Sequence, residues 1–263
     1  IILKKHLIMG EFITSILLPT VGKVIIKKAT ESFLDKKENI ITYVKANLSN
    51  LKYQDVRFSI SYLVRIQIPG SSKFLLVRGN RIKEQFQPVG GVYKKYNGFS
   101  EFDNYGYKPD CGSKGIENDD ISKDDLRFTV KGKNVLDVIK WFETGKGRED
   151  NAHREFNEEL LETEILDKEI FKNLQFDFVR KVANILKWST YHNCYEVLIY
   201  DIVNFIPSPE QTDALRKLLV ETRNPKNDYI LADLSEIERL RLMDGDKQIG
   251  KIGEHTKYLI NEK

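Results

Sequence analysis

The stretch over residues 154–160 constrains the fold of this chain most, because its acidic and apolar residues follow helical spacing. Glu155, Glu158 and Glu159 stand at positions i, i+3 and i+4, which share one face of a helix. Phe156 then lies on the opposite face, toward a core. Crowded carboxylates raise each other's pKa, and a hard divalent cation such as Mg2+ relieves their repulsion. A solvated acidic helix face is the alternative interpretation of the same pattern.

Charge and cysteine content narrow the classes of protein. The 263 residues include 42 basic and 39 acidic side chains, for a formal net charge of +3. This near balance gives no reason to expect a nucleic-acid polymer as a partner. The length suits one good-sized core with appendages. Cys111 and Cys194 lie far apart without metal-ligand spacing, which favours a reduced cytosolic compartment over a disulfide.

An apolar stretch, Leu7–Ile26, lies near the start of the printed sequence, and Glu11 and Lys23 are its only charged residues. About 20 apolar residues span a bilayer. Three interpretations stay open: a membrane helix, an amphipathic helix at the membrane interface, or an ordinary helix packed on the domain. We expect an apolar N-terminal helix over residues 1–28 and a polar helical connector over residues 29–55.

From residue 56 onward the pattern alternates between strand and helix signals. β-Branched residues alternate with polar ones over 56–68, and 73–79 continues as a second strand. An insertion over about residues 95–145 begins with a polar, irregular segment. The order of strands, insertion, helix, strands and helices predicts an α+β domain over 56–263. Further expected elements are helices over 134–143, 150–161, 211–221 and 252–260, strands over 175–182, 195–205 and 229–232, and a capping box of Ser235 and Glu238.

Several residues ahead of the insertion are candidates for nucleotide binding. Gly90 and Gly91 let the backbone approach a ligand or metal closely, although a plain β-turn would also use them. Arg78 and Arg81 can pair with phosphate, and Tyr93 can stack on a base. A solvated strand edge and simple packing are the alternatives for these side chains. Weaker candidates are Phe99, Phe102, Tyr105 and Tyr107 for stacking, Glu101 and Asp103 as a base, and His192 and His255 as ligands.

The double glycine and the stretch over 154–160 together resemble the Nudix hydrolase superfamily, over a region from about Val56 to the C-terminus. The resemblance implies an α/β/α sandwich around a mixed sheet. It also implies hydrolysis of a nucleoside diphosphate linked to another group, with Mg2+ or Mn2+ as cofactor.

The same resemblance implies roles for individual residues. Glu155, Glu158 and Glu159 match the metal-binding, catalytic glutamates, and Arg154 matches the arginine that orients them. The glycines at 90 and 91 match the pair whose backbone joins the metal site.

Three positions depart from the family pattern. Lys146 stands where the family has a glutamate eight residues before the arginine. Lys140 and Leu161 stand where the family has glycines. These departures favour binding of a metal or nucleotide over hydrolytic turnover.

A narrower resemblance rests on the segments RGNRIKEQFQPVGGVYKKY, HREFNEEL and GEHTKYL. They are similar to the Nudix domain associated with CD-NTases in bacterial CBASS antiphage operons, whose members place membrane segments before that domain. This implies a cyclic nucleotide ligand, a CD-NTase as pathway partner and a homo-oligomer formed on activation. It also implies the bacterial inner membrane as location, with the Nudix domain in the cytoplasm; a wholly cytoplasmic protein is the alternative.

Two functions follow as hypotheses. In the first, a nucleotide signal binds the Nudix domain and the N-terminal segment then associates with or disrupts the membrane. In the second, the chain is a metal-dependent pyrophosphohydrolase acting on a nucleotide derivative. A soluble housekeeping Nudix protein is a third, plainer possibility.

Overall fold

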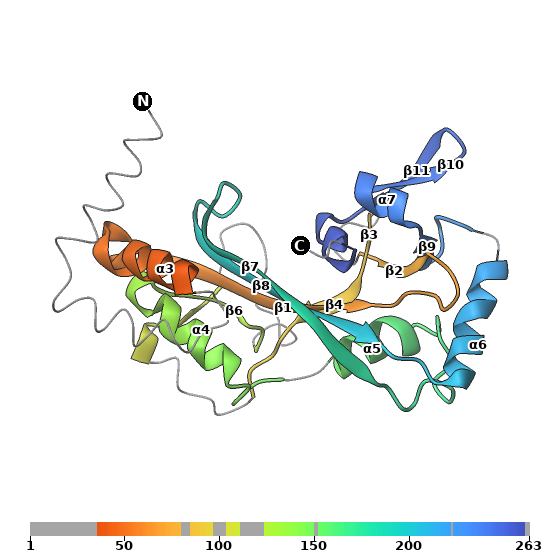
Figure 1. The fold of residues 1–263 in the computed structure, drawn as a ribbon, viewed down its shortest axis with the longest axis horizontal. Coiled ribbons are helices and arrows are strands. Elements are labelled where there is room, and N and C mark those ends of the chain that lie inside the picture. The colour runs from red at the N-terminus through yellow and green to blue at the C-terminus, as the bar shows by residue number, and fades with distance from the viewer. Residues whose placement is uncertain are drawn as a thin grey trace. The chain divides into compact units, whose positions relative to one another are not determined.

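The computed structural model describes residues 36–79, 85–96, 104–110, 124–149, 152–221 and 223–260. The chain divides into two compact units. The first comprises Ile1–Phe58, Lys95–Arg148 and Ile185–Val197, and the second comprises Ser59–Lys94, Glu149–Asn184 and Leu198–Lys263. Three long strands contribute residues to both units: β1 (Asp55–Arg65), β7 (Phe176–Ser189) and β8 (Cys194–Phe205) (Figure 1).

The strands form two sheets. The six-stranded sheet has the order β5-β6-β1-β8-β7, with β4 paired to β1, and the five-stranded sheet has the order β10-β11-β3-β2-β9. Strand β11 is parallel to β3, whereas β2 is antiparallel to β3 and β9, so the second sheet is mixed. The predicted mixed sheet with helices is therefore confirmed, and the three-layer sandwich stays a prediction. The remaining strands are β2 (Phe74–Arg78), β3 (Gln85–Gln87), β4 (Val89–Val92), β5 (Lys108–Pro109), β6 (Arg127–Lys131), β9 (Tyr229–Ala232), β10 (Arg241–Asp244) and β11 (Lys247–Ile252).

In the first unit, helices α3 (Lys36–Leu48) and α4 (Val135–Glu143) accompany strands β5 and β6. Helix α3 lies within the predicted connector, and α4 buries its apolar side chains as the 134–143 pattern predicted. The ring of Phe58 on β1 stacks on Phe128 of β6 with centroids 5.2 Å apart. Short 3-10 turns at Asn50–Tyr53 and Gly132–Asn134 complete this unit.

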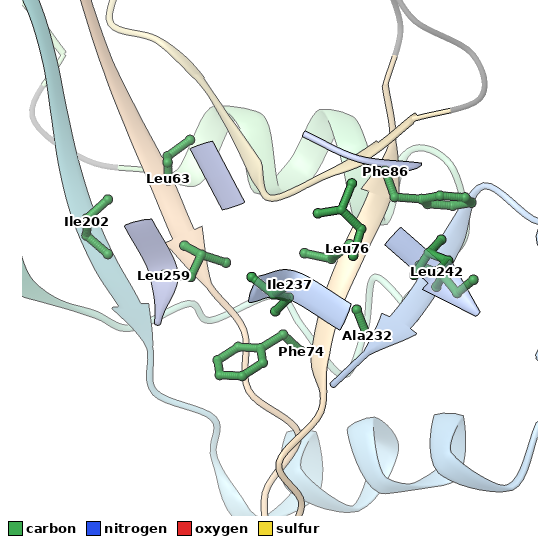
Figure 2. Packing of buried hydrophobic residues seen from close by; sticks show 11 residues of the cluster. Leu63, Phe74, Leu76, Phe86, Ile202, Ala232, Ile237, Leu242 and Leu259 are labelled. Atoms are coloured by element: carbon green, nitrogen blue, oxygen red, sulfur yellow. The ribbon is translucent and has the colours of Figure 1, made fainter. Parts of the chain in front are cut away.

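The second unit has its own apolar core, drawn in Figure 2. Leu76 of β2, Phe86 of β3 and Leu242 of β10 are almost completely buried. Ile237 from helix α7 (Leu234–Arg239) joins them from the helical side (Figure 2). Burial of each such side chain stabilises the fold by about 1.5–3 kcal/mol. The other helical segments of this unit are α5 (His153–Phe156), a π-helical turn at Asn157–Leu161, α6 (Pro209–Lys217), and 3-10 turns at Leu218–Val220 and Glu254–Leu259.

The C-terminal helix predicted over residues 252–260 is wrong in part. Strand β11 ends at Ile252, and only a 3-10 turn follows at Glu254–Leu259. The hairpin of β10 and β11 was not predicted, although its two-residue turn, Gly245 and Asp246, is a Gly-Asp pair in which Gly245 has φ +57°. A two-residue turn that begins with glycine is a hairpin signal, because the first turn residue needs positive φ.

Two other boundaries differ from the prediction. The strand expected over 175–182 continues to Ser189, so β7 and β8 form a longer hairpin than the pattern indicated. The capping box at α7 uses Asp233 and Glu236 instead of Ser235 and Glu238. An aspartate is as good an N-cap as a serine, so residue type alone did not separate the two positions.

Among the residues that the structure describes, no helix is long and apolar enough to cross a membrane. The predicted apolar segment Leu7–Ile26 lies outside these residues.

Candidate metal and nucleotide site

The acidic segment is a helix, but not one of uniform pitch. Four residues of α5 lead into a π-helical turn at Asn157–Leu161, where the Glu162 amide donates to the Asn157 carbonyl across 2.8 Å. π-Turns are rare and frequent at functional sites. Phe156 is fully buried, with its ring 5.0 Å from that of Phe205, so the predicted core-facing side is confirmed.

The double glycine of β4 lies directly against this helix. The Gly90 amide donates to a carboxylate oxygen of Glu159 across 3.0 Å. A Cβ placed on Gly91 would overlap the carboxylate of Glu155. Strand β4 pairs with β1 in the register that sets Gly91 opposite Tyr62. The two sequence features, 64 residues apart between Gly91 and Glu155, therefore form one site.

Arg154 is the centre of the charge arrangement. Its guanidinium donates to Glu149 at 2.8 Å, to Glu155 at 2.5 Å and to Glu158 at 3.3 Å. A fourth bond, 3.0 Å long, reaches the Val92 carbonyl at the end of β4. Because the planar guanidinium holds its donors in a fixed geometry, these bonds fix the rotamers of the glutamates around it. The Arg154 guanidinium is thus placed to orient Glu155 and Glu158, and the orienting role stays a prediction.

Glu149 is a partner of Arg154 that the sequence pattern did not single out. Lys146, eight residues before the arginine, is one of the three departures from the pattern that the sequence resembles. Glu149 instead supplies a carboxylate to Arg154 from five residues before it, with a second bond of 3.3 Å to the same guanidinium. Its own backbone amide donates to the Lys94 carbonyl at 2.9 Å, which fixes the loop that carries it.

Burial makes the two inner carboxylates unusual. Desolvation, with the neighbouring carboxylates adding to it, raises the pKa of Glu159 to about 8, although the Gly90 amide opposes the shift. Desolvation also raises the pKa of Glu155, and the charge of Arg154 opposes that rise. Glu158 is the outer member, with 47% of its side chain exposed. An added cation beside Glu155 and Glu159 would therefore stabilise the charged forms that burial disfavours.

The carboxylate oxygens of Glu155, Glu158 and Glu159 are the ligand type that a hard divalent cation prefers. Because Gly91 has no side chain, its backbone lies unusually close to the Glu155 carboxylate. In the described part of the chain, no three acidic, histidine or cysteine side chains are already arranged around one point as ligands would be. The predicted Mg2+ or Mn2+ thus remains a prediction.

The predicted nucleotide-binding side chains are placed differently. Arg78 donates to the carbonyls of Pro225 and Asn227 at 2.6 Å, contacts that favour a structural role. Tyr93 is only 4% exposed and donates to Asp201 at 3.0 Å, so its ring packs in the core and offers no open face to a base. Arg81 lies outside the described residues.

Two of the weaker candidates have aromatic packing partners among the described residues. Tyr107 packs against Phe128 in the first unit, and His255 stacks on Tyr200 in the second. Phe99, Glu101, Phe102 and Asp103 lie outside the described residues. One residue close to the site had not been predicted: Tyr62 is fully buried beside Tyr93, and its hydroxyl has no hydrogen-bond partner among the described residues.

A mixed α/β unit with paired glycines against a helical Arg-Glu-x-x-Glu-Glu cluster defines a Nudix domain. The model of the SMODS-associated NUDIX domain family matches residues 55–260, and the chain belongs to that family. This membership links the chain to CBASS-type defence systems and to the context of a CD-NTase pathway with its nucleotide signal. Searches of curated proteins and of solved structures returned no match.

Proposed function

We propose that the chain is a CBASS-type antiphage effector whose Nudix domain binds a nucleotide signal, with a cyclic oligonucleotide as the expected ligand. The observation that supports this most is the intact cluster around Arg154, in which Glu155 and Glu159 lie against the double glycine. The family context supports a nucleotide as the ligand.

In this proposal Glu155, Glu158 and Glu159 hold Mg2+ or Mn2+, and the ion, when bound, offsets the charge of the ligand's phosphates. Arg154 keeps the glutamates in place through its four hydrogen-bonded partners, including Glu149. The Gly90 amide donates to Glu159. Because Gly91 has no side chain, the Glu155 carboxylate can lie directly against the backbone of β4.

Signal binding would then promote homo-oligomer formation and act on the bacterial inner membrane through Leu7–Ile26. A ligand shifts such an equilibrium only by its differential affinity for the two states. The apolar character of that segment and its place ahead of the family domain support this coupling.

Calorimetry with cyclic di- and trinucleotides and Mg2+ tests ligand binding by the 263-residue chain. We expect one member of the panel to bind, and Glu159→Gln to weaken its binding at least tenfold. Glu162→Gln is the matched control, because Glu162 is an exposed glutamate that directly follows the π-turn. Absence of binding across the panel, or equal binding by the Glu159 and Glu162 variants, would reject the proposal.

Hydrolysis of a nucleotide derivative is a second candidate function. The observation in its favour is Glu149, which gives Arg154 a carboxylate partner in spite of Lys146. Product chromatography with a panel of nucleoside diphosphate derivatives and Mg2+ tests it. Turnover that is lost in Glu158→Gln and kept in Glu162→Gln would support the enzyme, whereas the absence of turnover would leave signal binding as the function.

A further inference from the structure

Tyr62 is a buried polar side chain close to the acidic site. It belongs to β1, and its side chain is 0% exposed. Its hydroxyl has no hydrogen-bond partner among the described residues. Buried polar groups in proteins almost always have a partner, because a buried hydroxyl without one costs stability. A role in a neighbouring functional site is one of the recognised explanations for such an exception.

The strand register places Tyr62 beside the Glu155 carboxylate. Strand β4 lies along β1 and sets Gly91 directly opposite Tyr62 (Figure 1). Directly opposite residues of an antiparallel pair point their side chains to the same face, with Cβ atoms about 4.5–5.5 Å apart. The carboxylate of Glu155 occupies the place that a Cβ on Gly91 would take. The tyrosine ring and this carboxylate therefore lie next to each other on one face of the strand pair.

The Tyr62 hydroxyl is also within electrostatic reach of the charges around Arg154. Burial raises the pKa of Tyr62, and the charge of Arg154 opposes the rise. The carboxylates of Glu155 and Glu149 raise this pKa further, whereas the backbone N–H of Glu155 lowers it. Both the guanidinium and two of the carboxylates that it binds are thus neighbours of the hydroxyl.

The adjacent Tyr93 uses its hydroxyl in the core. Its ring lies 4.8 Å from that of Tyr62, and its hydroxyl donates to Asp201 at 3.0 Å. The Asp201 carboxylate also pairs with Lys181. The two buried tyrosines therefore differ in one respect. The fold uses the hydroxyl of Tyr93, whereas the hydroxyl of Tyr62 keeps its donor for a partner outside the bonds that the described residues make.

Glu155 is the acceptor that suits this donor. Its carboxylate is bonded to Arg154. In the part of the chain that the structure describes, no three acidic, histidine or cysteine side chains converge as metal ligands would. The glutamates must therefore turn before they hold a cation together. A hydroxyl bonds most strongly to a charged oxygen, and the Glu155 carboxylate is next to Tyr62.

We propose that Tyr62 is a positioning residue, whose hydroxyl donates to the Glu155 carboxylate when that carboxylate turns to bind a divalent cation. The new hydrogen bond fixes the turned rotamer of Glu155. The metal-free protein has a buried hydroxyl without a partner, and the metal-bound protein does not, so the hydroxyl favours the bound state. This inference rests on the metal site of the proposed function and adds a residue that supports it.

Tyr62→Phe tests the proposal, because it removes the hydroxyl and keeps the ring. Calorimetry with Mn2+ alone, on the 263-residue chain in a mild detergent, should show affinity reduced about fivefold or more. In EDTA the melting temperature of this variant should be no lower than that of wild type, since the lost hydroxyl had no partner. A residue with a merely structural role would show the reverse pattern.

Three control variants complete the test. Tyr93→Phe should lower the melting temperature in EDTA, because it takes a donor from buried Asp201. Tyr229→Phe removes a hydroxyl that pairs with Glu221, and it should leave Mn2+ affinity unchanged. Glu159→Gln should abolish Mn2+ binding, which locates the ion at this site.

The possible results separate this inference from the proposed function. If wild type binds Mn2+ through Glu159 and Tyr62→Phe binds it equally well, the role of Tyr62 is wrong and the metal site stands. The role is also wrong if Tyr62→Phe lowers the melting temperature in EDTA as much as Tyr93→Phe does. If wild type binds no Mn2+, or if binding survives Glu159→Gln, the metal site and the role of Tyr62 are both rejected.

Discussion

At the scale of single residues, Gly90 and Gly91 are adjacent, but a side chain would meet a different obstacle at each. Gly90 has φ +153°, and a Cβ there would overlap the backbone carbonyl of Tyr62. At Gly91 the obstacle is the end of the Glu155 side chain, which can move. The first position is therefore required by the fold and the second by the site.

Alanine at each glycine separates these roles. We expect Gly90→Ala to lower the free energy of unfolding by about 2 kcal/mol or more, because the backbone is strained and cannot yield. Gly91→Ala should leave stability nearly unchanged and displace Glu155, which weakens Mg2+ binding about tenfold or more. Urea unfolding and metal titration measure the two effects. Equal loss of stability in both variants would contradict this assignment.

The raised pKa of Glu159 predicts a dependence of stability on pH. Its pKa is about 8 in the folded chain against 4.5 for an ordinary glutamate, so the folded state binds the proton more tightly. Stability from this group is complete below about pH 4.5 and is lost as the pH rises toward 8. We expect a loss on the order of 3–4 kcal/mol between pH 5 and pH 8.

Urea unfolding at several pH values between 5 and 8 measures the slope of the free energy of unfolding against pH. Glu159→Gln keeps an oxygen for the Gly90 amide and removes the titration, so most of the slope should disappear. The slope that remains has a contribution of the same sign from Glu155, whose pKa is also raised. Glu162→Gln should keep the full slope, and an unchanged slope in Glu159→Gln would show that Glu159 titrates normally.

At the scale of elements, the start of α7 allows two possible N-cap residues, Asp233 and Ser235, to be compared. The Asp233 carboxylate accepts from the Glu236 amide at 3.0 Å, and Glu236 accepts from the Asp233 amide at 3.1 Å. Asp233→Ala should lower the free energy of unfolding by about 1 kcal/mol. Ser235→Ala should cost much less, because Ser235 only adds an exposed bond to Asp233. Thermal or urea unfolding of both variants measures these losses. A larger loss in the free energy of unfolding for Ser235→Ala would mean that Ser235, as predicted from the sequence, is the N-cap.

The elements that periodicity predicted well are those with one apolar face. Helix α4 and the core side of α5 with its π-turn are examples, because burial follows the helical repeat. Periodicity failed at β10 and β11, where short strands carry too few buried residues to show alternation. It also could not indicate the π-turn after Phe156, which depends on tertiary packing around the site.

The site residues that could be predicted from the sequence are those whose residue type and spacing both indicate a metal site. The glutamates, Arg154 and the double glycine were all found from sequence, and the structure brings them together. Glu149 was missed because its role depends on the path of the preceding loop. Arg78 and Tyr93 were suggested by residue type alone, and only the tertiary structure shows that their polar atoms already bind carbonyls and Asp201.

At the scale of the molecule, Arg57 connects distant parts of the first unit. It pairs with Asp110 and with Glu196, both at 2.7 Å, across 53 and 139 positions of the chain. Arg57→Met would leave the buried Glu196 and the half-buried Asp110 without their cation. We expect a loss of about 3–5 kcal/mol in the free energy of unfolding.

Lys108→Met is the control for Arg57→Met. Lys108 pairs with Asp55 at 3.0 Å in the same unit, but 60% of its side chain is exposed, so its loss should cost below about 1 kcal/mol. Chemical unfolding of both variants measures the difference. Similar costs would mean that the buried arrangement around Arg57 adds little to stability.

The partnership of Glu149 and Arg154 has a consequence for how such sites evolve. The carboxylate reaches the guanidinium from a loop and not from a fixed position on the helix, so the number of residues between them can change as the loop is rebuilt. Insertions and deletions ahead of the helix are then tolerated as long as some acid returns to the same point in space. A motif defined by counting residues would reject such descendants, whereas one defined by the arginine's neighbours would retain them.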